Sequence, residues 1–442
     1  MSDISSRKTY CIVTFGCQMN VHDSEKLSGV LRRKGLEYSD DPQKADIVVF
    51  NTCSVRLKAE EKFYTALGRL KRSKEKNEKK IIIVAGCTAQ ASADEIFKRA
   101  PYVDIIIGPR SLDRILENIS ALDGNTLIDT DLNGNVFDQL KYDSVMDIYD
   151  RPSPVRAYVT IMEGCNNFCS YCIVPYTRGR EIYRDKTQIL NEIRFLADKG
   201  YLEIILLGQN VNAYKNSGYG FADLLADVAR VGGIQRVRFV TSHPAFLDER
   251  TIKAMAEYDN ICPQLHLPLQ SGSDVILKAM NRKYTLKEYI DKINNIKYNI
   301  KNVSLSSDFI IGFPGEADKD FNNTMEAVRE IEYDQIFSFV YSTRPYTPAS
   351  NYKDDVPLQI KKERLQALQN LQGKIQLQKN KNEVGKILET LVDGFSKKES
   401  TVLSGRTVAN KIVNFEGPAE LMNTITPVKI ISASQNSLRG IL

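Results

Sequence analysis

Short apolar, β-rich runs alternate with amphipathic helical segments along most of this 442-residue chain. In the first third, strands are expected near residues 10–15, 47–50, 81–85 and 105–107, with helices near 24–33, 59–71, 94–98 and 112–119. This alternation predicts an α/β domain whose parallel sheet is covered by helices on both faces. We assign residues 1–150 to this domain.

The alternation resumes after the stiff Arg-Pro-Ser-Pro segment at 151–154. Six further strands are expected near residues 156–162, 203–207, 236–240, 264–267, 304–311 and 335–340. Six parallel strands fit a partial (β/α)6 barrel over residues 151–378, with its chemistry at the carboxyl ends of the strands. A helix is expected over 357–381, and glycine-broken β-rich runs then predict a small β-barrel over 379–442.

Composition narrows the class of protein. No apolar run approaches the ~20 residues that a membrane helix needs. The polar start of the chain lacks the apolar stretch of a signal peptide, so we expect a cytoplasmic location with reduced thiols. The net charge of +5 permits nucleic-acid binding without arguing for it. We expect a monomer with no membrane partner.

Three cysteines lie close together in Gly-Cys-Asn-Asn-Phe-Cys-Ser-Tyr-Cys at 164–172. A structural zinc site usually adds a second cysteine pair or histidines, and none of the three histidines lies near this stretch. Iron–sulfur clusters usually have four thiolate ligands, so three thiolates would leave one iron open to a small molecule. We therefore predict a 4Fe–4S cluster on Cys165, Cys169 and Cys172, which we call the loop trio.

Three other cysteines each follow a predicted strand of the first domain. These are Cys17, Cys53 and Cys87, which we call the strand-end trio. Neighbouring parallel strands lie ~5 Å apart, so thiols at adjacent strand ends can converge on one metal cluster. The alternative is three separate core thiols, since free cysteine is common in cores. Cys11 and Cys262 lie within or at the head of strands, and we interpret both as core residues.

Polar residues at the carboxyl ends of the barrel strands are candidates for binding a small molecule. They are Gln209, Asn210, Ser242, Gln270 and Asp308, although each could equally belong to a turn or a helix cap. Arg178 follows the loop trio and could bind a carboxylate or a phosphate through two nitrogens.

The cysteine spacing at 164–172, with an aromatic residue before the last cysteine, resembles the radical S-adenosylmethionine (SAM) superfamily. Together with the stretches at 16–20, 51–56, 86–90, 176–179, 405–407 and 411–417, it resembles the methylthiotransferase family over essentially the whole chain. The terminal segment is similar to a TRAM domain, an RNA-binding barrel.

The resemblance implies a transferase with two 4Fe–4S clusters, one on each trio, and SAM as methyl donor and radical source. It also implies a tRNA anticodon stem-loop as partner and a low-potential electron donor. Tyr176 and Phe313 are then candidates for stacking on the target base. The wording Gly-Cys-Gln-Met-Asn and Tyr-Thr-Arg-Gly favours the branch that converts N(6)-dimethylallyladenosine next to the anticodon to its 2-methylthio derivative.

Two alternatives stay open at this point. The substrate of a methylthiotransferase could instead be threonylcarbamoyl-adenosine in tRNA or an aspartate of a ribosomal protein. A different class is an RNA-binding electron carrier whose clusters only shuttle electrons. An iron without a protein ligand speaks against the carrier, because electron transfer gains nothing from an open site.

Overall fold

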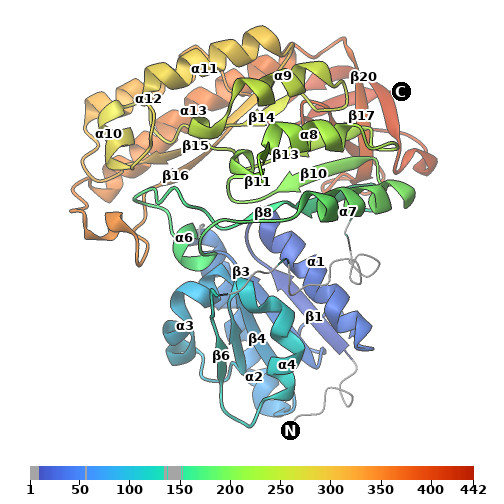
Figure 1. Cartoon of the computed structure of the whole chain (residues 1–442), viewed down its shortest axis with the longest axis vertical. Helices are drawn as coiled ribbons and strands as arrows, with labels where there is room; N and C mark the ends of the chain where they lie inside the picture. The colour runs from blue at the N-terminus through green and yellow to red at the C-terminus, as the bar shows by residue number, and fades with distance from the viewer. Residues whose placement is uncertain (1–8, 55–56, 134–136, 138–150, 152) are drawn as a thin grey trace.

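The computed structural model describes residues 9–54, 57–133, 137, 151 and 153–442, and every structural statement refers to these residues. The expected linker at 151–154 includes residue 152, which lies outside them. Figure 1 shows the N-terminal sheet below a central barrel, with the closed C-terminal barrel against another side of that barrel.

The N-terminal unit is a six-stranded parallel sheet in the order β2-β1-β3-β4-β5-β6. Its strands are β1 (Thr9–Thr14), β2 (Glu37–Tyr38), β3 (Ile47–Thr52), β4 (Ile81–Gly86), β5 (Ile105–Ile107) and β6 (Leu127–Asp129). Its helices are α1 (Gln18–Arg33), α2 (Leu57–Lys76), α3 (Cys87–Arg99), the 3₁₀ helix η2 (Pro109–Arg114) and α4 (Ile115–Ser120).

Helices cover both faces of this sheet, as predicted (Figure 1). Along β3, Ile47 and Val49 face α1 and α4, whereas Val48 and Phe50 face α2 and α3. This follows from the alternation of side chains along a strand, and it explains why strands buried on both faces form continuous apolar runs. Cys11 is buried among the residues on the α2 side, which confirms its assignment to the core.

Two helices begin earlier than the sequence predicts. Helix α1 begins at Gln18 and α3 begins at Cys87, whereas the helical patterns suggest residues 24 and 94. The first turns are buried but carry mostly polar or small residues, such as Asn20 and Asp23 in α1 and Thr88 in α3, so they show no apolar periodicity. As a consequence Cys17 is the N-cap of α1 and Cys87 is the first residue of α3, where the helix dipole favours a thiolate.

The central unit contains the six predicted parallel strands as two three-stranded sheets, β7-β10-β13 and β14-β15-β16. A parallel β-bridge between Val237 of β13 and Ile261, which precedes β14, joins the two sheets. The strands are β7 (Arg156–Thr160), β10 (Glu203–Leu207), β13 (Arg236–Phe239), β14 (Gln264–His266), β15 (Ser304–Ile311) and β16 (Gln335–Val340). Short pairs are β8 (Met162–Glu163) with β9 (Ile182–Tyr183), and β11 (Lys215–Asn216) with β12 (Tyr219–Gly220).

Helices surround this partial barrel and bury one continuous core (Figure 1). They are α7 (Lys186–Asp198), α8 (Phe221–Ala229), α9 (Glu249–Glu257), α10 (Asp274–Ala279), α11 (Leu286–Asn299), α12 (Asp318–Ile331) and α13 (Leu358–Lys381). The short helix α6 (Val174–Thr177) instead lies between the barrel and the N-terminal unit, next to α3. Cys262 is buried beside the barrel strands, as expected for a core residue. Among the described helices, none combines the length and the hydrophobicity that a bilayer crossing requires.

The C-terminal segment closes into a five-stranded barrel in the order β17-β18-β19-β21-β20, which confirms the predicted small barrel. Its strands are β17 (Ile387–Phe395), β18 (Leu403–Thr407), β19 (Ile412–Phe415), β20 (Ile425–Ala433) and β21 (Leu438–Ile441). The residues around Val392, Leu403 and Phe415 form its own apolar core.

Two buried arginines of β13 hold this small barrel against the amino end of the central one. Arg238 donates Nη1 to the carbonyl oxygen of Val408 and Nη2 to that of Thr407, both at 2.7 Å. Its Nε donates to Glu203 at 2.8 Å, which compensates the buried charge. Arg236 donates in the same way to two further carbonyls of β17 and β18.

We expect Arg238→Ala to loosen the small barrel and to destabilise the chain by ~3–5 kcal/mol, because it leaves Glu203 buried without its ion-pair partner. The measurements are thermal unfolding and the rate of proteolysis within residues 382–442. The control is Arg230→Ala, which removes an exposed ion pair with Asp227. Equal effects of the two substitutions would contradict this account of the interface.

Candidate functional site

The loop trio lies between β8 and α6, at the carboxyl end of the barrel. Cys165 and Cys169 are buried and Cys172 is half-buried. Burial raises the pKa of Cys165 to about 11, and the neighbouring Cys169 adds to the rise. Burial also raises the pKa of Cys172, with further contributions from both other thiols. The three thiols are therefore close enough to repel one another as thiolates, and they need a cation to be stable in that form.

A sharp backbone turn brings this loop together. Gly164 has φ +80°, and its N–H donates to Oε1 of Gln209 at 2.6 Å. Any Cβ at Gly164 would lie 2.1 Å from the carbonyl oxygen of Arg180. The next residue, Cys165, donates its N–H to the carbonyl of Gly179 at 3.2 Å. The cysteine loop is thus held directly against the segment that follows α6.

The strand-end trio occupies neighbouring strand ends, because β1, β3 and β4 are adjacent in the sheet. A hydrogen bond with Cys53 is the main reason that the pKa of Cys17 falls to about 6. Burial raises the pKa of Cys87, and the charge of Cys17 raises it further. The structure therefore brings together the three thiols that sequence reasoning could place only at consecutive strand ends.

Both trios offer the donor set of an iron–sulfur cluster. Among the described residues, no three His, Cys, Asp or Glu side chains are arranged to hold a metal ion. A cluster distributes its thiolate ligands over several irons, so its ligands need not converge on one point. Three cysteines on each side, without a fourth thiol, leave room for a non-protein ligand.

The strand-end trio faces the mouth of the barrel. Cys17 and Met19 pack against Ile205, Leu207 and Val240, which lie on β10 and just after β13. The N-terminal unit therefore covers the carboxyl end of the barrel, and the small C-terminal barrel lies at the opposite, amino end.

A polar cavity of about 410 Å³ runs between these two ends. Gln18, next to the strand-end trio, lines one part of it, and Arg406 and Lys411 of the small barrel line another. Tyr158 and Arg238 contribute from the barrel strands. Both charge and aromatic surface are therefore available inside the barrel to a polar, anionic molecule.

Several predicted small-molecule contacts have buried polar atoms without a hydrogen-bond partner. They are both amide atoms of Asn210, Oγ of Ser242 and Oε1 of Gln270. A buried polar atom without a partner is costly, and such atoms at strand ends fit a polar ligand that supplies the missing bonds. Gln270 also has φ +75°, a strained conformation that is more common at functional sites than elsewhere.

The other predicted contacts already have protein partners. Gln209 accepts the Gly164 N–H through its side-chain oxygen, as described above. Asp308 lies 3.4 Å from Nε2 of His266 and is partly exposed. His243 accepts the N–H of Ala245 and caps a short helix, and burial lowers its pKa to about 2. His243 is therefore a neutral structural residue.

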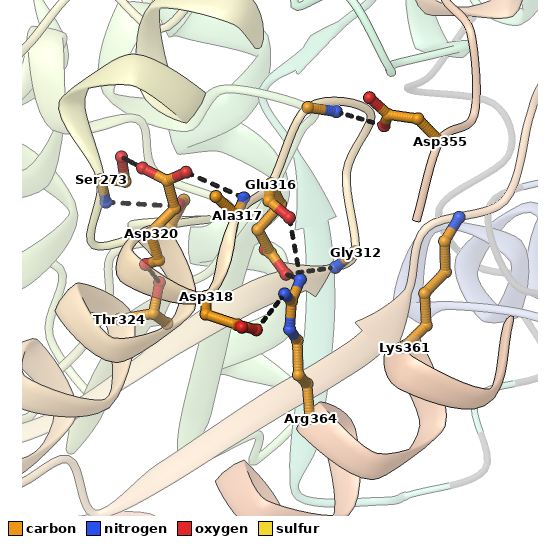
Figure 2. A network of polar contacts seen from close by, with 12 residues as sticks. Ser273, Gly312, Glu316, Ala317, Asp318, Asp320, Thr324, Asp355, Lys361 and Arg364 are labelled. Atoms are coloured by element: carbon orange, nitrogen blue, oxygen red, sulfur yellow. Dashed lines mark hydrogen bonds and ion pairs between the residues drawn. The ribbon is translucent and has the colours of Figure 1, made fainter. Parts of the chain in front are cut away.

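The loop after β15 is fixed by the polar network in Figure 2. Glu316 accepts the N–H of Gly312 at 2.9 Å and Nη1 of Arg364 at 2.8 Å. Arg364 also donates to Asp318 at 2.7 Å, which ties α13 to the start of α12. Phe313 in this loop is fully buried against Tyr341, so the prediction that it could stack on a base is wrong.

Sequence reasoning missed Arg282, a buried residue beside the loop trio. Its Nη1 lies 3.5 Å from Sγ of Cys169, its Nε donates to Oη of Tyr284 at 2.7 Å, and its Nη2 donates to the carbonyl of Pro268 at 2.9 Å. The sequence Met-Asn-Arg-Lys-Tyr gives no sign of this role, because Cys169 is 113 residues away.

Arg178 does not lie free at a cluster mouth. Its Nη2 donates to Asp23 of α1 at 2.5 Å, and its side chain is 3% exposed. Burial disfavours the charged form, but attraction to Asp23, Cys87 and Glu163 outweighs it, so the pKa of Arg178 is raised well above its usual value. The structure thus places Arg178 beside the strand-end trio.

Known families match three parts of the chain. Residues 9–108 match the uncharacterized protein family UPF0004, residues 159–328 the radical SAM superfamily and residues 381–442 the TRAM domain. The fold is similar to that of a radical S-adenosylmethionine methyltransferase, TsrM from Kitasatospora setae. The TM-score is 0.56 at 14% identity, over 77% of this chain and 75% of that one.

These regions define a radical SAM protein with an N-terminal α/β domain and a terminal TRAM barrel, and membership of the superfamily implies SAM and a 4Fe–4S cluster. A protein of Carboxydothermus hydrogenoformans named tRNA-2-methylthio-N(6)-dimethylallyladenosine synthase is 45% identical over 99% of this chain and 100% of its own length. A protein of the same name from Clostridium botulinum is 46% identical over 99% and 98%. The chain belongs to the family of tRNA-2-methylthio-N(6)-dimethylallyladenosine synthases, which confirms the resemblance seen in its motifs.

We expect Gly164→Ala to lower the iron content of the reconstituted chain, because the added Cβ meets the Arg180 carbonyl in a backbone conformation that favours glycine. Such backbone strain costs ~1–3 kcal/mol even before the clash. Gly218→Ala is a matched control, since Gly218 has φ +83° and open space around it. The same iron content in both variants would show that the close approach at Gly164 is unimportant.

Proposed function

We propose that this chain converts N(6)-dimethylallyladenosine next to the anticodon of a tRNA to its 2-methylthio derivative. SAM serves both as methyl donor and as source of a 5′-deoxyadenosyl radical. The observation that carries the proposal is the presence of two cysteine trios at the mouth of one barrel, in a chain similar over its whole length to synthases of this name.

The target carbon explains why two sites are needed. Carbon 2 of the adenine ring carries a hydrogen that is neither acidic nor polarised, so acid–base side chains cannot remove it. When bound, a reduced 4Fe–4S cluster with SAM supplies a radical that can. The protein then has to position the base, exclude water and keep the sulfur donor on the other side of the target carbon.

Each trio has one task in this proposal. Cys165, Cys169 and Cys172 hold the cluster that binds SAM. Cys17, Cys53 and Cys87 hold a second 4Fe–4S cluster, from which the sulfur is delivered.

The residues that contact SAM are proposed from their unsatisfied atoms. Asn210, Ser242 and Gln270 donate to or accept from its polar groups, since their buried atoms lack protein partners. Gln209 and Asp308 contribute to the same surface. Arg178, predicted as a SAM contact, has its charge directed instead to Asp23 and the strand-end trio.

The polar cavity between the two ends of the barrel supports a nucleic-acid substrate. Arg406 and Lys411 of the TRAM barrel and Arg156 of β7 line it, although Lys411 is paired with Asp334 and Glu383 and Arg156 with Asp393. A phosphate entering from the TRAM end therefore has to compete with these carboxylates for the cations. A base splayed from a single-stranded loop can reach the interior, as sequence-specific RNA recognition usually requires. The proposal also includes a low-potential electron donor as a partner. It places the protein in the cytoplasm as a monomer.

The alternatives from the sequence analysis, another substrate or an electron carrier, lead to different experimental results. A carrier would not cleave SAM, whereas the buried unsatisfied atoms at the barrel mouth suit a ligand. A threonylcarbamoyl or peptide substrate would leave the prenylated nucleoside unchanged.

We expect Cys17→Ala to keep forming 5′-deoxyadenosine from SAM while 2-methylthio product is lost entirely, because only the strand-end trio is altered. The measurement is mass spectrometry of nucleosides from cells without their own enzyme, together with 5′-deoxyadenosine from purified, reduced protein. Cys11→Ala is the control. Cys11 lies on β1, the strand that leads to Cys17, but its thiol packs in the core, so both products should persist.

Three results would count against the proposal. Loss of 5′-deoxyadenosine as well, in folded Cys17→Ala protein, would refute the division of labour between the trios. Absence of 2-methylthio-dimethylallyladenosine from wild-type cultures would refute the substrate. Wild-type protein that is reduced yet leaves SAM intact would refute the enzyme and favour the carrier.

We expect Asn210→Ala to raise the Kd for SAM about tenfold, the equivalent of ~1.4 kcal/mol, because both amide atoms lose their role toward the ligand. Calorimetric titration of the iron-loaded protein measures this directly. Asn299→Ala alters an exposed helix residue and should bind SAM as the wild type does. Unchanged affinity in Asn210→Ala protein with full iron content would remove Asn210 from the SAM site.

A further inference from the structure

The last strand of the barrel, β16, carries two half-exposed phenylalanines on its inward face. Ile336 packs into the central core and Oγ of Ser338 accepts a hydrogen bond from Gln369 of α13, so these two residues face outward toward the helix. Phe337 and Phe339 alternate with them and therefore face the interior. They are 38% and 40% exposed, although the interior of such a barrel is normally packed with apolar side chains. We call this pair the phenylalanine wall.

One end of the phenylalanine wall borders the polar cavity. Phe337 lines this cavity and lies opposite Asp308 of β15 in the strand register. The rings of Phe337 and His266 meet edge to face, with centroids 6.0 Å apart and an angle of 70° between their planes. The wall is therefore continuous with the space that a base reaches in the proposed function.

The other end of the wall adjoins the loop trio. Phe339 lies opposite Ile310 of β15, and Ile310 packs in the same apolar cluster as Tyr171, which precedes the last cysteine of the trio. Gln270, whose side-chain oxygen lacks a partner, lies beside the same part of β15. Its N–H donates to the carbonyl of Asp308 at 2.9 Å, and its own carbonyl accepts the N–H of Ile310 at 3.1 Å. The wall thus extends from the cavity to the proposed SAM contacts.

The wall leaves apolar surface uncovered inside a polar space. Within the described residues β16 pairs only with β15, so the barrel is open along this edge. Two neighbouring rings there are in contact with water. Covering such surface with an apolar group is favourable, roughly in proportion to the area removed from water. The wall therefore suits a ligand that is polar overall but carries one apolar part.

The target nucleotide of the proposed function has such a part. Carbon 2 of the adenine and the substituent on N(6) lie on the same edge of the ring. A base that presents carbon 2 at the mouth of the barrel therefore places its dimethylallyl group close by, where the wall reaches the mouth. The dimethylallyl group is apolar and uncharged. The substituent of threonylcarbamoyl-adenosine instead carries a carboxylate, which would lie near the carboxylate of Asp308 and be repelled by it.

We propose that Phe337 and Phe339 bind the dimethylallyl group of the target nucleotide and thereby select a prenylated adenosine as substrate. The inference rests on the proposed function, in which this nucleotide is modified at the mouth of the barrel. The rings remove the apolar substituent from water, and Asp308 beside them disfavours an anionic one. The wall acts on this substituent alone, so it contributes little to the binding of SAM or of the rest of the RNA.

The test measures the binding of RNA hairpins to the full-length, iron-loaded protein by fluorescence anisotropy. The hairpins share one anticodon stem-loop sequence and differ only in whether the adenosine next to the anticodon carries the dimethylallyl group. Phe337→Ala and Phe339→Ala are compared with Phe97→Ala, a matched control because Phe97 is 44% exposed on α3 of the N-terminal unit. Iron content and thermal unfolding check that each variant is loaded and folded.

We expect each substitution in the wall to raise the Kd for the prenylated hairpin about tenfold, because one of the two rings that cover the apolar group is lost. The Kd for the unmodified hairpin and the Kd for SAM should not change. Phe97→Ala should bind all three ligands as the wild type does. Phe337→Gln keeps the bulk of the side chain at this half-exposed position and should behave like Phe337→Ala, so it provides the same test if the smaller side chain destabilises the strand.

The comparison of hairpins separates this role from others. Equal weakening for both hairpins would show that the wall holds the base or the fold rather than the dimethylallyl group, and a raised Kd for SAM would assign the rings to the cofactor. Either result, or unchanged binding of the prenylated hairpin, would overturn the inference while the proposed function stands. Wild-type protein that cleaves SAM but forms no 2-methylthio product on the prenylated hairpin would instead refute the proposed function, and the inference with it.

Discussion

Thiolate charges gathered in a small buried volume repel one another, and burial adds a further penalty for each charge. The chain concentrates six of its eight cysteines in two such places. Burial and mutual repulsion raise the pKa of Cys165 to about 11, so the loop trio is poorly suited to exist as bare thiolates. This electrostatic requirement explains what surrounds the trios. Helix N-termini and buried arginines stabilise negative charge there, and glycines allow the backbone to approach closely.

The two trios meet the requirement differently. The strand-end trio has two helix N-termini, at Cys17 and Cys87, together with Arg178. The loop trio has no helix N-terminus of comparable length and instead has Arg282 against Cys169. In both cases the cation is an arginine that several partners fix in place, which suits a planar group with five donors better than it would suit lysine.

Much of the fold could be predicted because parallel strands buried on both faces appear in the sequence as continuous apolar runs. The strands at 105–107, 203–207, 304–311 and 335–340 have the predicted bounds. The strand-end trio could be predicted because consecutive parallel strands end at one edge of a sheet. The start of α1 could not, since a cysteine N-cap is not among the usual capping residues.

Long-range partners account for what the sequence left hidden. Arg178 was predicted close to a cluster, but nothing near it in the chain indicates Asp23, which lies 155 residues away. Arg282 gives no local signal for the same reason. The unsatisfied atoms of Asn210, Ser242 and Gln270 are visible only when every neighbour has a position, so sequence reasoning could not separate ligand contacts from ordinary caps.

The attachment of the TRAM barrel has an evolutionary consequence. Arg236 and Arg238 contact it through the backbone carbonyls of Glu389, Arg406, Thr407 and Val408. Every amino acid presents the same carbonyl, so side chains at these four positions can be exchanged without removing those bonds. The outer surface of the TRAM barrel can therefore change to fit new RNA shapes while its attachment to the catalytic barrel is retained.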